Sequence, residues 1–200
     1  SNNSKFNLAV STSFVDLLNS QFGIKSLVFP NIIDEDFLLD DYSKKSINQI
    51  FVFLNDASLD KNKNHELLIR EFAKKFQGSK AVLKIIGEGY LLLQLKKLCK
   101  DLKVYDQVFF LGLLERKQVK YEMQNANCFV LSSNYETFGV VLIEALSLGI
   151  PVISTNCGGP YDIVNNDNGI LVKTNNIDEE FEIDSNIESE SDTDIDTYSD

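Results

Sequence analysis

Apolar positions follow two periods along the middle of the chain, from about residue 47 to residue 172. Short apolar runs bounded by turn residues predict buried strands at 49–54, 80–87, 107–112, 127–133, 150–155 and 168–173. Apolar residues at helical spacing, as at Leu68, Phe72 and Phe76, predict helices at 64–76, 90–102, 117–126, 138–149 and, shorter, at 159–165. Strands that alternate with helices form βαβ units, so we expect an α/β domain with a Rossmann-like, doubly wound parallel sheet of about six strands.

The two ends of the chain do not share this rhythm. Residues 14–23 are typical of a helix that ends at Gly23, and the apolar residues 27–29 precede a turn, so we interpret 1–46 as a connector from a preceding domain. Residues 178–200 contain 11 acidic and no basic residues, whereas the rest of the chain contains 19 of each. Such a segment has little apolar surface to bury, so we expect a disordered acidic tail after a domain of residues 47–177.

Charge and cysteine usage limit the function classes. No basic stripe is present, which argues against a nucleic acid partner. Cys99, Cys128 and Cys157 are far apart and odd in number, so we expect reduced, buried thiols in a cytoplasmic protein rather than disulfides or a metal site. No apolar run approaches about 18 residues, so no membrane span is expected.

The strongest candidate chemistry lies where predicted strands end, because ligands of such sheets bind at the carboxyl ends of the strands. The loops after residues 54, 87, 112, 133 and 155 should therefore line one crevice. Gly139 opens a helix after a strand, and free amides at such a helix start attract phosphate. Glu136 and Glu144 flank it, either as carboxylates that accept hydrogen bonds from sugar hydroxyls or as a capping acid and a residue at the solvent edge.

Other patterns carry weaker signals. Lys61 and Lys63 lie in a loop that opens a helix, where a lysine could reach a diphosphate or be solvated, and His65 in the first turn of that helix is interpreted as a surface residue. The Gly-Glu-Gly of 87–89 lacks the third glycine of a dinucleotide fingerprint. The D-x-D spacings at 34–36 and 192–196 lie in connector or acidic context, so neither indicates a metal site, and no G-x-S-x-G elbow of a hydrolase is present.

Taken in order, these segments resemble the C-terminal, donor-binding half of family 4 (group 1) retaining glycosyltransferases of the GT-B fold. The resemblance runs from about residue 8 to residue 173 and includes "VFPNIIDEDF", "ASLDKNKNHELLIREFA", "LKIIGEGYLLLQL" and "QVFFLGLLERKQV". It is most specific in "SSNYETFGVVLIEALSLGIPVISTNCGGPYDIVNNDNGILV", which contains both glutamates, the paired glycines and the final strand.

The resemblance implies a hexosyltransferase that takes its sugar from a nucleotide diphosphate, most often a UDP-sugar, without a cofactor or a metal. It implies that Glu144 binds the ribose and Glu136 a hydroxyl of the transferred sugar, while Lys63 neutralises the leaving diphosphate. The amides of Phe138, Gly139 and Val140 would hold the phosphates, and backbone near Gly112 and Leu113 would meet the base. The acceptor, a glycan or lipid, and peripheral membrane contact would belong to the N-terminal half.

Two departures from the family pattern keep an alternative open. Ser58 occupies the position where the family usually has an arginine, and Asp162 the position where it often has glutamate. The N-terminal half is also absent from this chain. The alternative is a truncated, non-catalytic module that binds nucleotide sugars or a protein partner.

Overall fold

The computed structural model describes residues 7–37 and 50–173. Its elements are, in chain order, β1 (Leu8–Ala9), α1 (Thr12–Phe22), β2 (Leu27–Val28), the 3-10 helix η1 (Glu35–Phe37), β3 (Val52–Asp56), α2 (His65–Phe76), β4 (Val82–Ile86), α3 (Leu92–Asp101), β5 (Val108–Gly112), α4 (Arg116–Gln124), β6 (Cys128–Leu131), α5 (Val140–Ser147), β7 (Val152–Thr155), the 3-10 helix η3 (Gly159–Asp162) and β8 (Gly169–Val172). The predicted strands and helices of the middle region are all present, mostly within one or two residues of the predicted bounds. The strand predicted at 49–54 is shifted, because β3 begins three residues later and ends two residues later, and the helix predicted at 159–165 is only the 3-10 helix η3.

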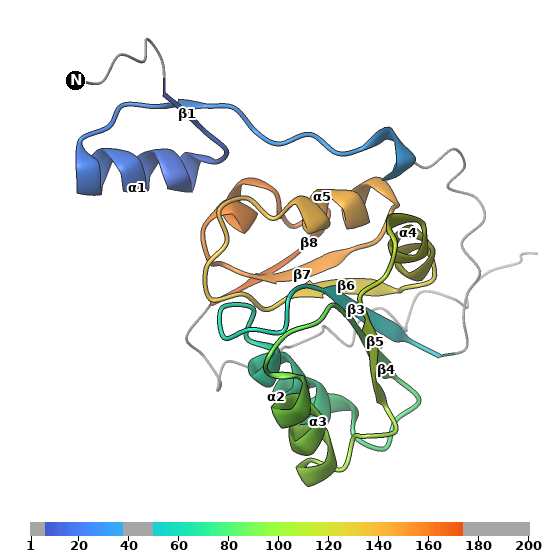
Figure 1. Ribbon diagram of the computed structural model, residues 1–200. Helices are drawn as coiled ribbons and strands as arrows, with labels where there is room; N and C mark the ends of the chain where they lie inside the picture. The colour runs from blue at the N-terminus through green and yellow to red at the C-terminus, as the bar shows by residue number, and fades with distance from the viewer. Residues whose placement is uncertain (1–6, 38–49, 174–200) are drawn as a thin grey trace, which may run out of the picture.

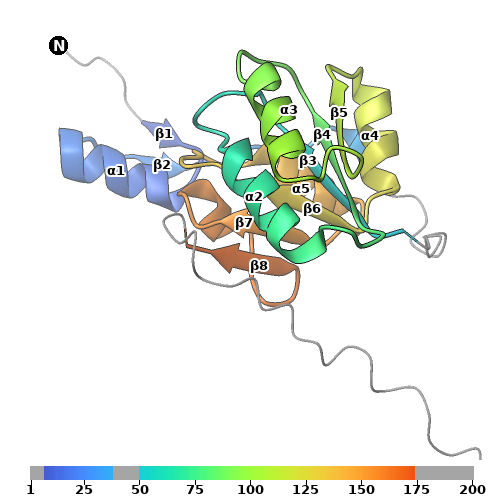
Figure 2. The same ribbon diagram turned by 90° about the horizontal axis from the view of Figure 1, so that it is seen from below.

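Six parallel strands form the main sheet in the order β5-β4-β3-β6-β7-β8, which confirms the predicted α/β fold (Figure 1). The strand order reverses between β3 and β6, which pair in parallel with Phe53 opposite Cys128. Helices α2 and α3 cover one face and α4 and α5 the other, so the sheet is doubly wound (Figures 1 and 2). Ligand crevices of such sheets open at the point where the order reverses, so the carboxyl ends of β3 and β6 mark the expected site.

Two apolar cores sandwich the sheet, and the two-residue period of the strands separates them. Phe53 belongs to the core beneath α2 and α3, whereas its neighbour Leu54 belongs to the core beneath α4 and α5. Strands that are buried on both faces have continuous apolar sequences, and this pattern is why the sequence predicts where they lie. All three cysteines are free and buried in these layers or their loops, as expected.

The N-terminal segment forms a small βαβ unit beside the main sheet (Figure 1). Strands β1 and β2 pair in parallel, and α1 begins at the N-cap Ser11 and ends at Gly23, which adopts the left-handed conformation that the sequence predicts. The unit is anchored to the main domain through Ser11, whose hydroxyl donates to the Thr137 carbonyl at 2.6 Å, and through Asp162, which accepts from the Thr12 amide at 2.6 Å. Asp162 therefore holds α1 in place.

The acidic segment 178–200, with its D-x-D spacing at 192–196, lies outside the described residues. Within 7–37 and 50–173, no helix is long and apolar enough to cross a membrane.

Candidate functional site

The loops after β3 and β6 are joined at the point where the strand order reverses. The Asn134 amide donates to the Asn62 carbonyl at 2.7 Å, and the Asn62 side chain donates to the Tyr135 carbonyl at 3.0 Å and accepts from its amide at 3.2 Å. Ser132 adds a bond from its hydroxyl to the Lys63 carbonyl at 2.8 Å. These bonds fix the two loops against each other, although their residues lie about seventy positions apart in the sequence.

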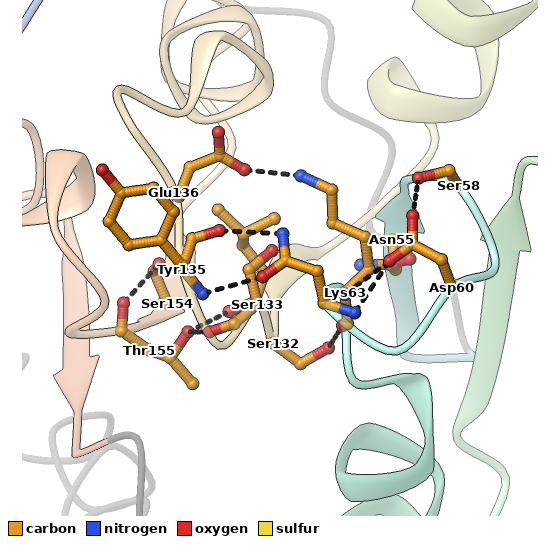
Figure 3. Close-up of polar contacts among 12 residues, drawn as sticks. Asn55, Ser58, Asp60, Lys63, Ser132, Ser133, Tyr135, Glu136, Ser154 and Thr155 are labelled. Atoms are coloured by element: carbon orange, nitrogen blue, oxygen red, sulfur yellow. Dashed lines mark hydrogen bonds and ion pairs between the residues drawn. The ribbon is translucent and has the colours of Figure 1, made fainter.

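Lys63 and Glu136 meet across these loops. The Lys63 Nζ lies 2.6 Å from Glu136 Oε2, and the two side chains are 22% and 18% exposed. Figure 3 shows the pair pointing toward one another from the two loops. The structure thus brings together the two residues for which the sequence and the resemblance predict catalytic roles, and each is accessible enough to exchange this partner for a ligand.

Ser58 does not join this pair. Its hydroxyl donates to Asp60 Oδ2 at 2.6 Å, while Asp60 Oδ1 accepts from the amides of Asn62 and Lys63 (Figure 3). These hydrogen bonds lower the pKa of Asp60, the Ser58 bond most strongly. Ser58 therefore stabilises the turn that carries Lys63, and Lys63 is the lysine of this loop that pairs with Glu136.

The paired glycines after β7 position Glu136. The Glu136 amide donates to the Cys157 carbonyl at 3.0 Å, and the Gly159 amide donates to the Glu136 carbonyl at 2.7 Å. A Cβ at Gly159 would lie 2.3 Å from the Phe138 Cα, and one at Gly158 would lie 2.6 Å from the Glu136 carbonyl oxygen. Only glycine permits backbones to approach this closely, so the pair clamps the loop that presents Glu136.

Helix α5 begins beside this loop. Phe138 is buried, and Gly139 adopts a left-handed conformation as the N-cap residue, so the helix starts at Val140, two residues later than predicted. The first amides of a helix have no intrahelical partner, and in α5 these begin at Val140, whereas Phe138 and Gly139 precede the helix.

Glu144 lies on the inner face of α5 rather than at the solvent edge, which shows that the second of our two interpretations of this residue is wrong. Its side chain is 6% exposed, and Arg116 Nη2 lies 2.9 Å from its Oε1. Burial raises the pKa of Glu144, while the Arg116 charge and hydrogen bond lower it. A buried carboxylate with one cationic partner is expensive to build, which favours a role in binding.

Sequence reasoning missed two charged neighbours of Glu144. Arg116 opens α4 and also lies 3.5 Å from Asp34, and Asp56 ends β3, where its pKa is raised to about 6 by burial first and by the Glu144 charge second. Asp56 could have been noticed, because an acid directly at the carboxyl end of an apolar strand points to the ligand edge of the sheet. The pairing of Arg116 with Glu144 had no signal in the sequence, because it depends on how α4 and α5 dock.

The loops after β4 and β5 lie next to the same edge. Gly87 and Gly89 allow the loop after β4 to approach the loop after β3, since a Cβ on either would lie within 2.3 Å of a carbonyl oxygen of Ala57 or Leu59. This close approach accounts for the Gly-Glu-Gly pattern. A Cβ at Gly112 would meet only the Glu88 Oε1, at 3.8 Å, and the Leu113 side chain is 77% exposed.

His65 is buried, not on the surface as expected. Its Nε2 lies 2.9 Å from Asn55 Oδ1, and Asn55 in turn donates to the Val130 carbonyl at 2.8 Å. Burial lowers the pKa of His65 to about 4, so the ring is neutral at pH 7. The sequence held the correct signal, because residue 65 lies one helical turn before Leu68 on the face that packs on the sheet. His65 fastens α2 to β3 and β6 beneath the site.

An open cavity of about 320 Å³ lies between α1 and the Glu136 loop. Phe14 and Leu17 from α1 line one side, and Tyr135, Glu136 and Cys157 line the other. In the parts of the chain that the structure describes, no cluster of three or more His, Cys, Asp or Glu could hold a metal ion. Of the charged groups described above, Glu136 lines this cavity, while Lys63 is paired with it and Arg116 and Glu144 lie outside the lining.

Comparison with known proteins places this arrangement in a family. The profile of the family described as "Glycosyl transferases group 1" matches residues 40–188. An uncharacterized glycosyltransferase of Methanocaldococcus jannaschii is 34% identical over 151 residues, which cover 70% of this chain and 36% of the relative. A Campylobacter jejuni 4-alpha-N-acetylgalactosaminyltransferase that acts on a diphospho-undecaprenol glycan is 34% identical over 158 residues, covering 76% and 41%.

Solved structures agree on the fold. Anabaena HepE in complex with UDP and glucose superposes with a TM-score of 0.74 at 20% identity, over 87% of this chain and 51% of that one. The chain thus spans about half the length of this structure and less of the curated relatives. With a family profile that covers most of the chain and a fold shared with glycosyltransferases, the protein belongs to the group 1 glycosyltransferase family.

Proposed function

We propose that this chain binds the nucleotide-diphosphate sugar of a retaining hexosyltransferase, as the C-terminal half of its GT-B fold. The observation that carries the proposal is the meeting of Lys63 and Glu136 at the strand-order reversal, next to the mouth of α5. A lysine and helix amides suit the diphosphate of such a ligand, and carboxylates suit the hydroxyls of its sugar and its ribose. Anabaena HepE, which has the same fold, was solved with UDP and glucose, and this supports a UDP-sugar as the ligand.

Each residue has a role set by its charge and place. The amides of Phe138, Gly139 and Val140 bind the diphosphate, and Lys63 gives up its bond with Glu136 to neutralise it. Glu136 then accepts a hydrogen bond from the transferred sugar, and Glu144 accepts from the ribose hydroxyls deeper along α5. Ser58 supports the loop of Lys63, and backbone near Gly112 and Leu113 contacts the base.

This arrangement favours transfer without a metal ion. Negative charge accumulates on the diphosphate as its bond to the anomeric carbon breaks, and Lys63 and the helix mouth stabilise that charge. The acceptor, a glycan or a lipid, approaches from the side of α1, where the open cavity adjoins Glu136. The free, buried cysteines suit a cytoplasmic location for the reaction.

Isothermal titration of the chain with UDP, GDP and ADP and with their sugar conjugates tests the proposal. We expect one nucleotide to bind in the absence of magnesium and with unchanged affinity in its presence. A folded chain that bound none of them would contradict the proposal, and binding that required magnesium would refute its metal-independent part.

A non-catalytic binding module is the second candidate, because Ser58 faces Asp60 at the position where an arginine would add a second cation. A donor hydrolysis assay distinguishes the two, since water replaces the acceptor and no other protein is needed. Slow release of UDP and free sugar that disappears in Lys63→Met supports the enzyme. Tight binding without release supports the module.

A further inference from the structure

Arg116, the first residue of α4, contacts Glu144 of α5 and two residues of the segment around η1, Asp34 and Phe37. Its Nη2 lies 2.9 Å from Glu144 Oε1, its Nε lies 3.5 Å from Asp34 Oδ2, and its guanidinium carbon lies 4.5 Å above the centre of the Phe37 ring. Phe37 is fully buried, and its carbonyl accepts a hydrogen bond from the Ser147 hydroxyl at 2.8 Å. The aromatic surface beneath the guanidinium is therefore fixed to the same helix that carries Glu144.

This contact set matters because Glu144 has two requirements as a ligand for ribose. It must be ionised, since a carboxylate accepts hydrogen bonds at both oxygens, and burial opposes ionisation. It must also present an oxygen to the ligand. Arg116 bonds to Oε1, and among the described residues no hydrogen bond reaches Oε2. Among the described residues, Oε1 of Glu144 is thus bonded to the protein, while Oε2 can accept a hydrogen bond from a ligand.

We propose that Arg116 is a positioning residue of the nucleotide site, which keeps Glu144 ionised and directs its Oε2 toward the ribose. The inference rests on the proposed role of Glu144 and extends it to a residue outside the two-glutamate pattern. Stacking on Phe37 requires a planar cation, and pairing with Glu144 through Nη2 and with Asp34 through Nε requires a fork, so arginine meets both demands and lysine only supplies charge.

The charges around Glu144 set the direction of the expected effects. Arg116 from α4 lowers its pKa, whereas Asp34 beside η1 raises it. Asp56 from β3 is the third carboxyl near the pair, and its own pKa is raised to about 6 by burial and by Glu144. Removal of Arg116 leaves three carboxyl groups without their shared cation, so Glu144 should take up a proton at higher pH. Removal of the Asp34 charge should have the opposite effect.

The test compares Arg116→Gln, Arg116→Lys and Asp34→Asn with wild type by UDP titration from pH 5.5 to 8.5. Arg70→Gln is the matched control, because Arg70 pairs with Glu66 on the exposed surface of α2, on the opposite face of the sheet from α4 and α5. We expect Arg116→Gln to bind UDP about tenfold more weakly at pH 6.5, with a deficit that shrinks toward pH 8.5. Each variant is compared with wild type at the same pH. The ionisation of UDP affects both proteins equally and therefore cancels.

The conservative variant separates charge from orientation. Arg116→Lys should restore the wild-type pH profile but remain about threefold weaker at all pH values, because it lacks the fork and the stack. The Glu144 carboxyl is also followed by carbon-13 NMR without ligand. Its pKa should rise in Arg116→Gln, fall in Asp34→Asn and stay unchanged in Arg70→Gln.

Two results would overturn the inference. One is an Arg116→Gln variant, folded by its unfolding curve, whose UDP affinity parallels wild type at every pH. The other is a Glu144 pKa that does not rise in that variant, and this measurement decides the matter even if wild type bound no nucleotide. Absence of wild-type binding would contradict the proposed function, while the NMR titration would still show whether Arg116 holds Glu144 ionised.

Discussion

Two buried titratable groups should oppose each other in the pH dependence of stability. His65 has a pKa lowered to about 4, mainly by burial, and Asp56 has a pKa raised to about 6, also mainly by burial. Between pH 4 and 6.5 the unfolded chain binds more protons at His65 than the native protein does, so its contribution to stability rises with pH. Between pH 3.8 and 6 the native protein binds more protons at Asp56, so that contribution falls with pH.

The magnitudes are similar. With an unfolded pKa of 6.5 and a native pKa of about 4, His65 makes the free energy of unfolding increase by about 2 kcal/mol from pH 4.5 to pH 6.5. With an unfolded pKa of 3.8 and a native pKa of about 6, Asp56 makes it decrease by about 2 kcal/mol over the same range. The two slopes cancel, so we expect wild-type stability to vary little there on their account.

Single substitutions expose each slope. His65→Gln removes the side chain whose contribution to stability rises with pH. From pH 4.5 to pH 6.5 the free energy of unfolding of this variant should therefore fall by about 2 kcal/mol relative to wild type. The free energy of unfolding of Asp56→Asn should rise by a similar amount relative to wild type over the same pH range. Urea unfolding followed by circular dichroism at half-unit pH steps measures the free energy of unfolding of each variant. Only the change of this free energy with pH is compared, so a constant loss of packing energy in a variant does not affect the result. Variant curves that run parallel to wild type would refute the reasoning.

Three further predictions concern the crevice and its support. Lys63→Met should weaken UDP binding by about tenfold or more because the diphosphate loses its cation, whereas Lys61→Met, an exposed lysine of the same loop, should bind as wild type in calorimetric titration. Glu136→Gln frees Lys63 from its ion pair, so affinity for UDP should rise about threefold while any preference for UDP-sugar over UDP is lost; weaker UDP binding would contradict this. Gly159→Ala forces a Cβ to within 2.3 Å of the Phe138 Cα and should cost about 2–3 kcal/mol in urea unfolding, more than Gly78→Ala, where the Cβ meets open space and only the positive φ opposes it.

The sheet and the position of the site were accessible from the sequence for a physical reason. Strands buried on both faces must be apolar along their whole length, so their positions and their alternation with helices are encoded locally. The rule that ligands bind at the carboxyl ends then placed Lys63 and Glu136 in one crevice, although 73 positions separate them, and the structure joins them at 2.6 Å.

The remaining features depend on docking that no local pattern encodes. Glu144 and Arg116 meet because α5 and α4 lie side by side on one face of the sheet. The charged groups that affect the pKa values at this place come from four parts of the chain. Ser11 and Asp162 anchor α1 across 126 and 150 positions by hydrogen bonds between a polar side chain and the backbone, which have no periodicity. His65 is different, because its position on the helix did indicate burial. We predicted a surface residue because the side chain is polar, and that prediction is wrong.

The measurement that tests the account most directly is calorimetric titration of UDP into wild type, Glu144→Ala and Glu122→Ala. Glu122 is the matched control, because it is also a helical glutamate in a half-buried ion pair, with Lys84 at 2.6 Å. The account predicts metal-independent binding to wild type and Glu122→Ala, and at least about tenfold weaker binding to a folded Glu144→Ala. Equal affinity of all three proteins for UDP would contradict the assignment of this crevice as the nucleotide site.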